Sequence, residues 1–501
     1  MPYYSVRGQL TRRAALFLGG AVVGAYAGAK LSGKVPPVEG ARLVQPSGGE
    51  NTLNDASLLS ERPINRHIVL KENPGEVLIN SVRGEMEAAR QEGRPFNIGA
   101  ARHSMGGHAI PPDGVALTYD NGLVEADTER GVFRVHAGAR WSQVIAELDR
   151  IGWSPKVMQS NNDFGVAATF CVNAHGWPVP YGPMGATVRT VYMVQPDGGL
   201  VRVSRDEFQD LFNLTMGGYG LTGAIIELEC EMVPNRRLVP SFRKLAAKDF
   251  APFFVGAIET GTVNMAYGRL NVDREYFFED ALLITYAEAE NQEELPAASG
   301  SGFVSQAAAK VFRAQLMNEY AKDLRWWIET GLGPMISGEV TRNSLLNEPV
   351  VTLDDGDPTR TDILHEYFVP PDRFADFVTA CQEVIPASYQ EMLNITLRYV
   401  AADRESVLAY APGPRIACVM LFSQEMTERA EADHKRMTRE LIDRVLELGG
   451  TYYLPYRPHA SRRQFRRAYP RAQEFAARKL ELDPGKLFRN TFWDNYLEGL
   501  V

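Results

Sequence analysis

The sequence predicts an α+β fold, because short strand-like runs alternate with helix-like runs along much of the chain. Apolar runs bounded by turn residues occur at 114–119 (GVALTY) and 131–138 (GVFRVHAG). A run with apolar residues at helical spacing follows at 141–152 (WSQVIAELDRIG). The segment 191–204 (VYMVQPDGGLVRVS) holds two alternating runs around Pro-Asp-Gly-Gly, which predicts a β-hairpin.

Length and composition predict more than one domain. The chain has 501 residues, which exceeds the usual size of one hydrophobic core. Apolar residues make up 45% and charged residues 23%, a globular balance that excludes collagen-like and mainly disordered proteins. Residues 236–444 are richer in acidic helical stretches than the preceding part, so we expect a second domain there.

Charge and cysteine content exclude several functional classes. The chain carries 53 Lys and Arg against 62 Asp and Glu, a formal charge of −9 that gives no general reason to bind nucleic acid or an anionic membrane. The four cysteines are far apart and contain no Cys-x-x-Cys pair, so we expect neither a zinc ribbon nor a disulfide framework. An arginine ridge at 462–471 is interpreted as a solvated helix face.

The N-terminus has the pattern of an export signal. Residues 11–29 contain Arg12-Arg13, about 16 apolar or small residues and Ala-x-Ala-like exits. This run is short for a bilayer span, which needs ~20 residues, and suits a signal sequence of the twin-arginine type. We therefore expect residues 1–29 to direct export, with an uncleaved membrane anchor as the alternative. Residues 30–63 are expected to be a linker, with the fold beginning near Ile64.

Two Gly-rich segments are candidate diphosphate-binding loops. Residues 96–108 and 162–176 are rich in glycine and alanine, whose missing side chains let backbone N–H groups approach a phosphate. A Gly-x-Gly-x-x-Gly pattern at 218–223 follows a helical run and precedes a strand. A nicotinamide Rossmann site requires the reverse order, so this pattern is not interpreted as one.

Four segments in order resemble the vanillyl-alcohol-oxidase-type (PCMH-type) FAD flavoproteins, nearest to alditol and aldonolactone oxidases and decaprenylphosphoryl ribose oxidase. They are IGAARHSMGGHAIPPDGVALTYDNGL (98–123), GVAATFCVNAHG (165–176), 183–234 and LDPGKLFRNTFWDNYL (482–497). The resemblance implies a two-subdomain FAD-binding domain at 64–235. It also implies an inserted α+β cap, or substrate, domain at 236–444 and a C-terminal segment, 445–501, that completes the FAD and active-site region.

The resemblance implies FAD as the cofactor, covalently attached through His103 to the 8α methyl of the flavin. A neutral imidazole is the nucleophile for this bond. His103 contacting the diphosphate without a covalent bond remains an alternative, and His108 is a second candidate for attachment. Cys171 lacks the Cys-Pro motif of doubly attached relatives. The other expected FAD-binding residues are Gly99, Ala100, Ala101, Arg102, Ser104, Gly106, Gly165, Ala168, Asn173, His175, Gly176, Gly223 and Ile226. A purely structural histidine remains the alternative at position 175.

The resemblance also implies two catalytic residues. Arg398 matches an arginine that alditol oxidases present towards the flavin, while Thr396 stands where those enzymes have Glu. His459 falls near a catalytic Lys that is missing here, and we expect it to accept the substrate proton. In the alternating run at 363–371, His365 and Tyr367 share one strand face and Glu366 lies on the other, so only one set can line the site.

The expected function is that of an exported FAD-dependent oxidoreductase acting on an alcohol group of a sugar, polyol or lactone. The electron acceptor is dioxygen or a quinone or carrier. The alternatives are a dehydrogenase of a non-sugar substrate, as in cytokinin dehydrogenases, and a non-catalytic flavin-binding protein. Partners are expected to be small molecules, with no nucleic acid, no metal and at most peripheral membrane contact.

Overall fold

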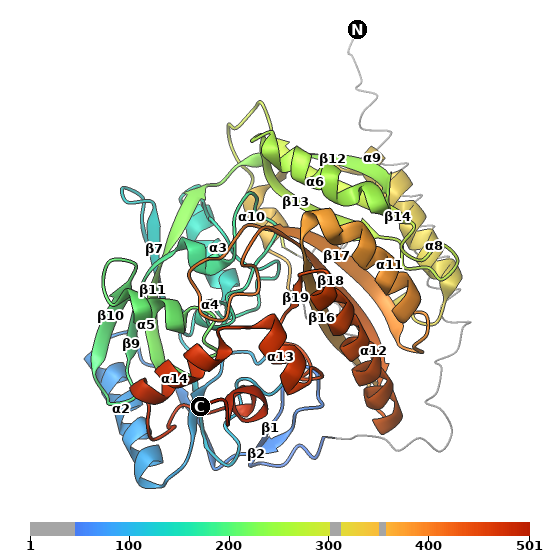
Figure 1. Ribbon diagram of the computed structural model, residues 1–501. Helices are drawn as coiled ribbons and strands as arrows, with labels where there is room; N and C mark the ends of the chain where they lie inside the picture. The colour runs from blue at the N-terminus through green and yellow to red at the C-terminus, as the bar shows by residue number, and fades with distance from the viewer. Residues whose placement is uncertain (1–45, 301–311, 350–356) are drawn as a thin grey trace.

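A computed structural model describes residues 46–300, 312–349 and 357–501. The predicted signal at 1–29 and the first part of the expected linker lie outside these residues. Three main sheets with their helices form a mixed fold of helices and strands, in agreement with the predicted class. In Figure 1 the blue and green N-terminal part lies on the left and the yellow and orange strands with their helices lie on the right.

The smallest of these sheets is parallel, three-stranded and close to the chain's C-terminal segment. Its strands, in order, are β3 (Arg66–Leu70), β5 (Val115–Tyr119) and β4 (Phe96–Ile98). Helix α2 (Glu76–Gln91) connects β3 to β4 and buries Leu78, Val82, Met86 and Ala89 at helical spacing. The Phe96 N–H donates to the Leu487 carbonyl oxygen at 2.7 Å, so residues near 487 border this sheet at β4.

The second sheet has six strands and contains the predicted hairpin. Its main path is β10 (Leu200–Ser204), β9 (Val188–Val194), β11 (Ala224–Pro234), β7 (Val132–His136) and β6 (Val124–Asp127), and β8 (Trp153–Pro155) pairs with β11. Leu200 pairs with Val194, which confirms the hairpin around Pro-Asp-Gly-Gly. Helix α3 (Trp141–Arg150) and helix α5 (Gln209–Thr215) confirm two of the predicted helical runs. The glycines at 217–223 follow α5 and precede β11, as expected.

The third sheet is antiparallel and has eight strands. Their order is β15 (Val340–Thr341), β12 (Arg237–Ala246), β14 (Asp280–Glu288), β13 (Val263–Leu270), β17 (Glu391–Val400), β18 (Arg415–Glu425), β16 (Arg360–Val369) and β19 (Thr451–Tyr452). Helices α6 (Phe250–Glu259), α11 (Phe374–Val384) and α12 (Glu428–Glu447) bury apolar side chains with it in one core. They lie on the outer side of the sheet in Figure 1, which leaves the other face towards the rest of the protein.

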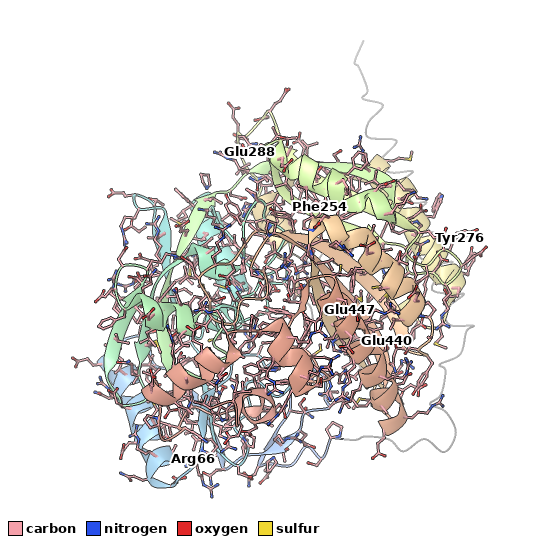
Figure 2. The ribbon with its side chains drawn as sticks, viewed as in Figure 1. Arg66, Phe254, Tyr276, Glu288, Glu440 and Glu447 are labelled. Atoms are coloured by element: carbon pink, nitrogen blue, oxygen red, sulfur yellow. The ribbon has the colours of Figure 1, made fainter. Side chains whose placement is uncertain are left out.

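The helices of the eight-stranded sheet separate buried from solvated side chains. Phe254 of α6 is fully buried, whereas Glu440 and Glu447, labelled on α12 in Figure 2, are exposed. The remaining helical elements are α4 (Val166–Cys171), η1 (Met184–Thr187), η2 (Ala247–Asp249), α8 (Glu319–Trp327), η3 (Ile328–Leu332), α9 (Gly333–Ile336), α10 (Arg342–Leu346), η5 (Pro371–Arg373), α13 (Arg462–Ala468), α14 (Ala472–Leu482) and η6 (Trp493–Leu497). Within the described residues, no helix is both long and apolar enough to cross a bilayer.

Part of the segment expected to be a linker is folded. β1 (Thr52–Leu53) pairs with β2 (Arg62–Pro63), and Asp55 between them is buried. Its carboxylate accepts the Gly107 N–H at 2.8 Å, which fixes the Gly-rich loop at 96–108. The linker prediction is therefore wrong for residues 52–63. Polar contacts rather than apolar periodicity hold this segment, so the hydrophobic pattern gave no sign of it.

Candidate functional site

A cavity of about 470 Å³ lies between the loops of the N-terminal part and the eight-stranded sheet. This volume is in the range of small-molecule and cofactor sites. One side consists of loop residues at 98–104 together with 159–177, and the other of side chains from β13, β16, β17 and β18. Tyr453 and Tyr456, which follow β19, also line the cavity. The two Gly-rich segments and the third sheet thus meet at one site.

Small residues on two facing loops shape the first side of the cavity. A Cβ atom added at Gly165 would lie 2.8 Å from the Ala100 Cβ, too close for any larger side chain. A Cβ at Gly99 would lie 3.1 Å from the Arg102 Nε. Arg102 donates to the Thr118 hydroxyl at 3.2 Å, and burial lowers its pKa. The loops therefore offer backbone and one guanidinium group to an elongated polar ligand.

His103 lines this side and its imidazole is held neutral. Its ring stacks on Phe164 with the centroids 4.1 Å apart. Burial lowers the pKa of His103, the charge of Arg140 lowers it further, and Asp163 opposes the shift. His108 also lines the cavity, and burial lowers its pKa to about 3. Both imidazoles are therefore uncharged near neutral pH, the form that can act as a nucleophile.

Strand register arranges the second side of the cavity. Arg269 of β13 pairs with Thr396 of β17, Thr396 with Val419 of β18, and Val419 with Glu366 of β16. Four strands therefore present one row of side chains, all of which line the cavity. Arg398 lies two residues beyond Thr396 on the same strand face and also lines it.

Glu366 is the centre of a buried polar cluster in this wall. Its side chain is 1% exposed, and one carboxylate oxygen is hydrogen-bonded to His175 Nε2. The Tyr456 hydroxyl donates to the other carboxylate oxygen at 3.4 Å. Arg398 Nη1 donates to the His175 carbonyl oxygen at 3.3 Å. Burial lowers the pKa of Arg398, and the Glu366 charge partly offsets that effect. The cluster combines a carboxylate, an imidazole and a cation around one part of the cavity.

His459 does not line the cavity, contrary to its expected role as proton acceptor. Its Nε2 lies 3.0 Å from a carboxylate oxygen of Glu431, and its Nδ1 lies 3.2 Å from the Thr438 hydroxyl. Its ring centroid is 5.2 Å from that of His365 and 5.5 Å from that of His434. These groups lie between β16 and α12, on the face of β16 opposite Glu366. The prediction placed His459 by sequence position alone, and the fold turns it away from Arg398.

The structure brings most of the expected cofactor residues together. Those that line the cavity are Gly99, Ala100, Ala101, Arg102, His103, Ser104, Gly165, Ala168, His175 and Gly223, together with Arg398. Those that do not are Gly106, Asn173, Gly176 and Ile226. Asn173 instead accepts the Gly185 N–H at 3.0 Å and donates to Asp403 at 2.9 Å. Gly106 is tightly packed, because a Cβ there would lie 2.9 Å from the Tyr456 carbonyl oxygen.

Sequence reasoning missed several cavity residues. Arg269, Asn394, Tyr453, Tyr456 and Trp177 all line it. The strand pairing that places Arg269 opposite Thr396 joins residues more than 100 positions apart, so no local pattern revealed it. The alternation at 363–371 did reveal that Glu366 and His365 face opposite ways, but it gave no sign of which face was inward.

The buried polar atoms of the cavity lining fit a polar cofactor such as FAD. Buried polar atoms without a hydrogen-bond partner among the described residues include Arg102 Nε, Tyr119 OH, His175 Nδ1, Trp177 Nε1 and Arg398 Nε. Unsatisfied buried polar groups are costly and are rare in native proteins unless a ligand or water pairs with them. The described residues contain no cluster of His, Cys, Asp or Glu that could hold a metal ion.

Comparison with known proteins supports FAD as the ligand of this cavity. Residues 79–204, from α2 to β10, match the FAD binding domain family. Both Gly-rich loops, at 96–108 and 162–176, lie within the matched segment.

The relatives that match include enzymes of sugar alcohols and lactones. An alditol oxidase of Streptomyces sp. is 32% identical over 139 residues, which are 27% of this chain and 33% of that protein. The mitochondrial L-galactono-1,4-lactone dehydrogenase of Brassica oleracea is 26% identical over 145 residues, 29% of this chain and 23% of that protein. Cytokinin dehydrogenase 7 of rice is 28% identical over 162 residues, 30% of each chain. The chain therefore spans a third or less of the curated relatives it matches.

Proposed function

We propose that this protein holds FAD in the cavity and oxidises an alcohol group of a sugar, polyol or lactone by hydride transfer. The observation that carries the proposal is the meeting of the small-residue loops with a wall that bears Arg398 and the Glu366–His175 pair. The matching segment of the FAD binding domain family contributes the first of these and the eight-stranded sheet the second. In this proposal that sheet and its helices form the cap over the flavin.

Each residue of the wall has a distinct chemical task. When bound, FAD would supply the hydride acceptor. Glu366 would take the proton from the substrate hydroxyl as the carbinol C–H bond breaks, with His175 and the Tyr456 hydroxyl orienting its carboxylate. The guanidinium of Arg398 would stabilise negative charge that develops on the substrate oxygen. The water-poor surroundings strengthen both interactions.

We further propose that His103 forms the covalent bond to FAD. The support is its place in the cavity wall together with its neutral imidazole. After acid precipitation of the purified protein, the yellow colour should remain in the pellet. His103→Ala should release the colour to the supernatant, whereas His108→Ala should not. Colour retained by the His103→Ala protein would overturn this attachment.

The electron acceptor and the cellular location also belong to the proposal. Dioxygen would make the protein an oxidase, and a quinone or carrier would make it a dehydrogenase; turnover with each acceptor separates the two. Export is supported by Arg12-Arg13 and the apolar run that follows. Changing both arginines to lysine should leave the protein in the cytoplasm. Unchanged export of that variant would contradict a twin-arginine signal.

The experiment that tests the function is anaerobic mixing of the holoprotein with a panel of polyols, aldonolactones and sugars. A member of the panel should bleach the flavin absorbance. If cytokinin-like amines bleach it and no alcohol does, the activity belongs to the non-sugar class of the third relative. If no compound bleaches it although light and EDTA do, the flavin is redox-competent and the alcohol proposal fails.

A further inference from the structure

Two arginines face the cavity from neighbouring strands without a carboxylate partner in the described part of the chain. Arg269 donates to the Thr396 hydroxyl, and its guanidinium lies 5.3 Å from the Tyr267 ring centroid. Arg398 donates to the His175 carbonyl oxygen. By contrast Arg325, which contacts the same strand through Asn394, forms an ion pair with Glu329 at 2.7 Å. The helical segment α8–η3 thus neutralises its own arginine, whereas Arg269 and Arg398 of the sheet line the cavity without an ion pair among the described residues.

Neither carboxylate of the described lining forms an ion pair with Arg269 or Arg398, although the Glu366 charge acts on Arg398 from a greater distance. The Glu366 carboxylate is already hydrogen-bonded to His175 and Tyr456. Glu348, the other carboxylate in the described lining, lies on the segment whose carbonyl accepts the Asn162 N–H, in the loops of the opposite side. A guanidinium that loses water without gaining an anion is strongly unfavourable, so an anionic ligand group beside Arg269 and Arg398 would be stabilising.

Thr396 holds the Arg269 guanidinium without neutralising its charge. It stands directly opposite Arg269 in the pairing of β13 with β17. A glutamate here would lie within reach of Arg269 and would neutralise it across the strand pair. The threonine leaves the guanidinium available to a ligand while still holding it in place through a hydrogen bond.

The row of side chains also sets the length of the ligand. Arg269 and Glu366 are separated by three strand spacings of ~4.8 Å, or about 14 Å between Cα atoms. The Arg269 guanidinium leans towards Thr396, one strand nearer to Glu366, and the remaining interval can take a short carbon chain between the guanidinium and the carboxylate. Arg398 lies diagonally between them and can reach the reacting oxygen.

We propose that the substrate is a short hydroxy acid of the sugar-acid type, such as an aldonate, whose carboxylate binds to Arg269 while the hydroxyl to be oxidised lies beside Glu366 and Arg398. This inference rests on the proposed function, since it names the substrate class of the same site. The reaction itself is unchanged: the carbinol C–H supplies the hydride, the hydroxyl proton goes to Glu366, and the carboxylate takes no part in bond changes.

The test compares an alditol with its own aldonate. Anaerobic flavin reduction is measured with xylitol and with xylonate in the holoprotein, in Arg269→Gln and in Thr396→Glu. The wild-type protein should favour xylonate in kcat/KM. Arg269→Gln should lower kcat/KM for xylonate by roughly 10- to 100-fold, the worth of a charge-assisted hydrogen-bonded pair, and change that for xylitol by less than about 3-fold. Thr396→Glu should lose the preference for xylonate, because the new carboxylate would pair with Arg269.

Matched controls separate charge from folding. Arg269→Lys keeps the charge but cannot form a bidentate hydrogen bond to a carboxylate, so it should retain part of the preference for xylonate. Arg243→Gln removes an exposed arginine of β12, outside the cavity lining, and should leave both substrates unchanged. Binding is read independently of turnover with glutarate, a dicarboxylate with no hydroxyl, through the shift that it causes in the flavin absorbance.

The outcomes distinguish this inference from the function on which it rests. Equal use of xylitol and xylonate by the wild-type protein, or an equal loss of both in Arg269→Gln, overturns the acid specificity and leaves alcohol oxidation standing. If neither compound reduces the flavin and glutarate still binds in an Arg269-dependent way, the anion site stands and the proposed reaction fails. Glutarate binding that is the same in wild type and Arg269→Gln overturns the anion site.

Discussion

Glu366→Gln is the substitution that tests the chemistry of the cavity most selectively. It keeps the size of the side chain and removes its ability to take a proton. The Glu366 side chain is 1% exposed, so bulk water has little access to replace it as the proton acceptor. The amide can still accept the Tyr456 hydroxyl and contact His175, so the strand and the loop should keep their places.

The expected magnitude follows from the role. A positioned general base contributes about 10²- to 10⁴-fold to a rate. Because Glu366 is the carboxylate closest to Arg398 among the described lining residues, we expect the upper part of that range, roughly 10³-fold slower flavin reduction. Binding of FAD should be unchanged. Tyr456→Phe removes only the long 3.4 Å hydrogen bond and should slow reduction by about 10-fold or less.

The assay is anaerobic rapid mixing, followed through the flavin absorbance. Glu366→Ala provides a second arm, since formate added to this variant can enter the vacated space and restore part of the rate. Glu366→Gln with full flavin content and a rate within about 3-fold of wild type would refute the assignment of Glu366 as proton acceptor.

Three other substitutions test separate parts of the account. His103→Ala should bind FAD only reversibly, because the nucleophile of the attachment is gone; gel filtration after denaturation measures the flavin lost, and retention contradicts the link. Arg398→Ala should slow flavin reduction by roughly 10²-fold at every pH, since a guanidinium stays charged; a rate loss at acidic pH alone would not fit. Burial lowers the pKa values of His365, His434 and His459, so the unfolded chain binds more protons than the folded chain on acidification. The free energy of unfolding should be greatest above pH ~6.5 and fall on acidification by up to about 1.4 kcal/mol per pH unit for each histidine. His434→Gln should reduce this slope in urea titrations at several pH values. An unchanged slope in that variant would contradict the prediction.

Local patterns predicted the elements better than their mutual placement. The hairpin of β9 and β10 and the order of α5 before β11 follow from periodicity and turn residues within a short stretch. The loops at 96–108 and 162–176 could be predicted as ligand-binding loops because their glycine and alanine residues let the backbone approach a ligand. Such signals depend only on neighbours in sequence, so they hold in the folded protein.

Contacts between distant segments were not accessible in this way. Glu366 meets His175 across 191 positions. Alternation shows that Glu366 and His365 face opposite ways, but which face is inward depends on α12 covering one side of β16. His459 pairs with Glu431 of α12 on that covered side, which removes it from the cavity. Residues 52–63 fold on polar partners such as Gly107, which no hydrophobic pattern can signal.

The central claim is that this cavity oxidises an alcohol carbon with bound FAD as the hydride acceptor. The most direct measurement is anaerobic flavin reduction by a substrate alcohol with hydrogen or deuterium on the carbinol carbon. The account predicts that the flavin is bleached by both compounds and more slowly by the deuterated one, because the C–H bond breaks in the reductive step. A flavin that stays oxidised with every alcohol, or one that is reduced at the same rate by both forms with chemistry rate-limiting, would contradict it.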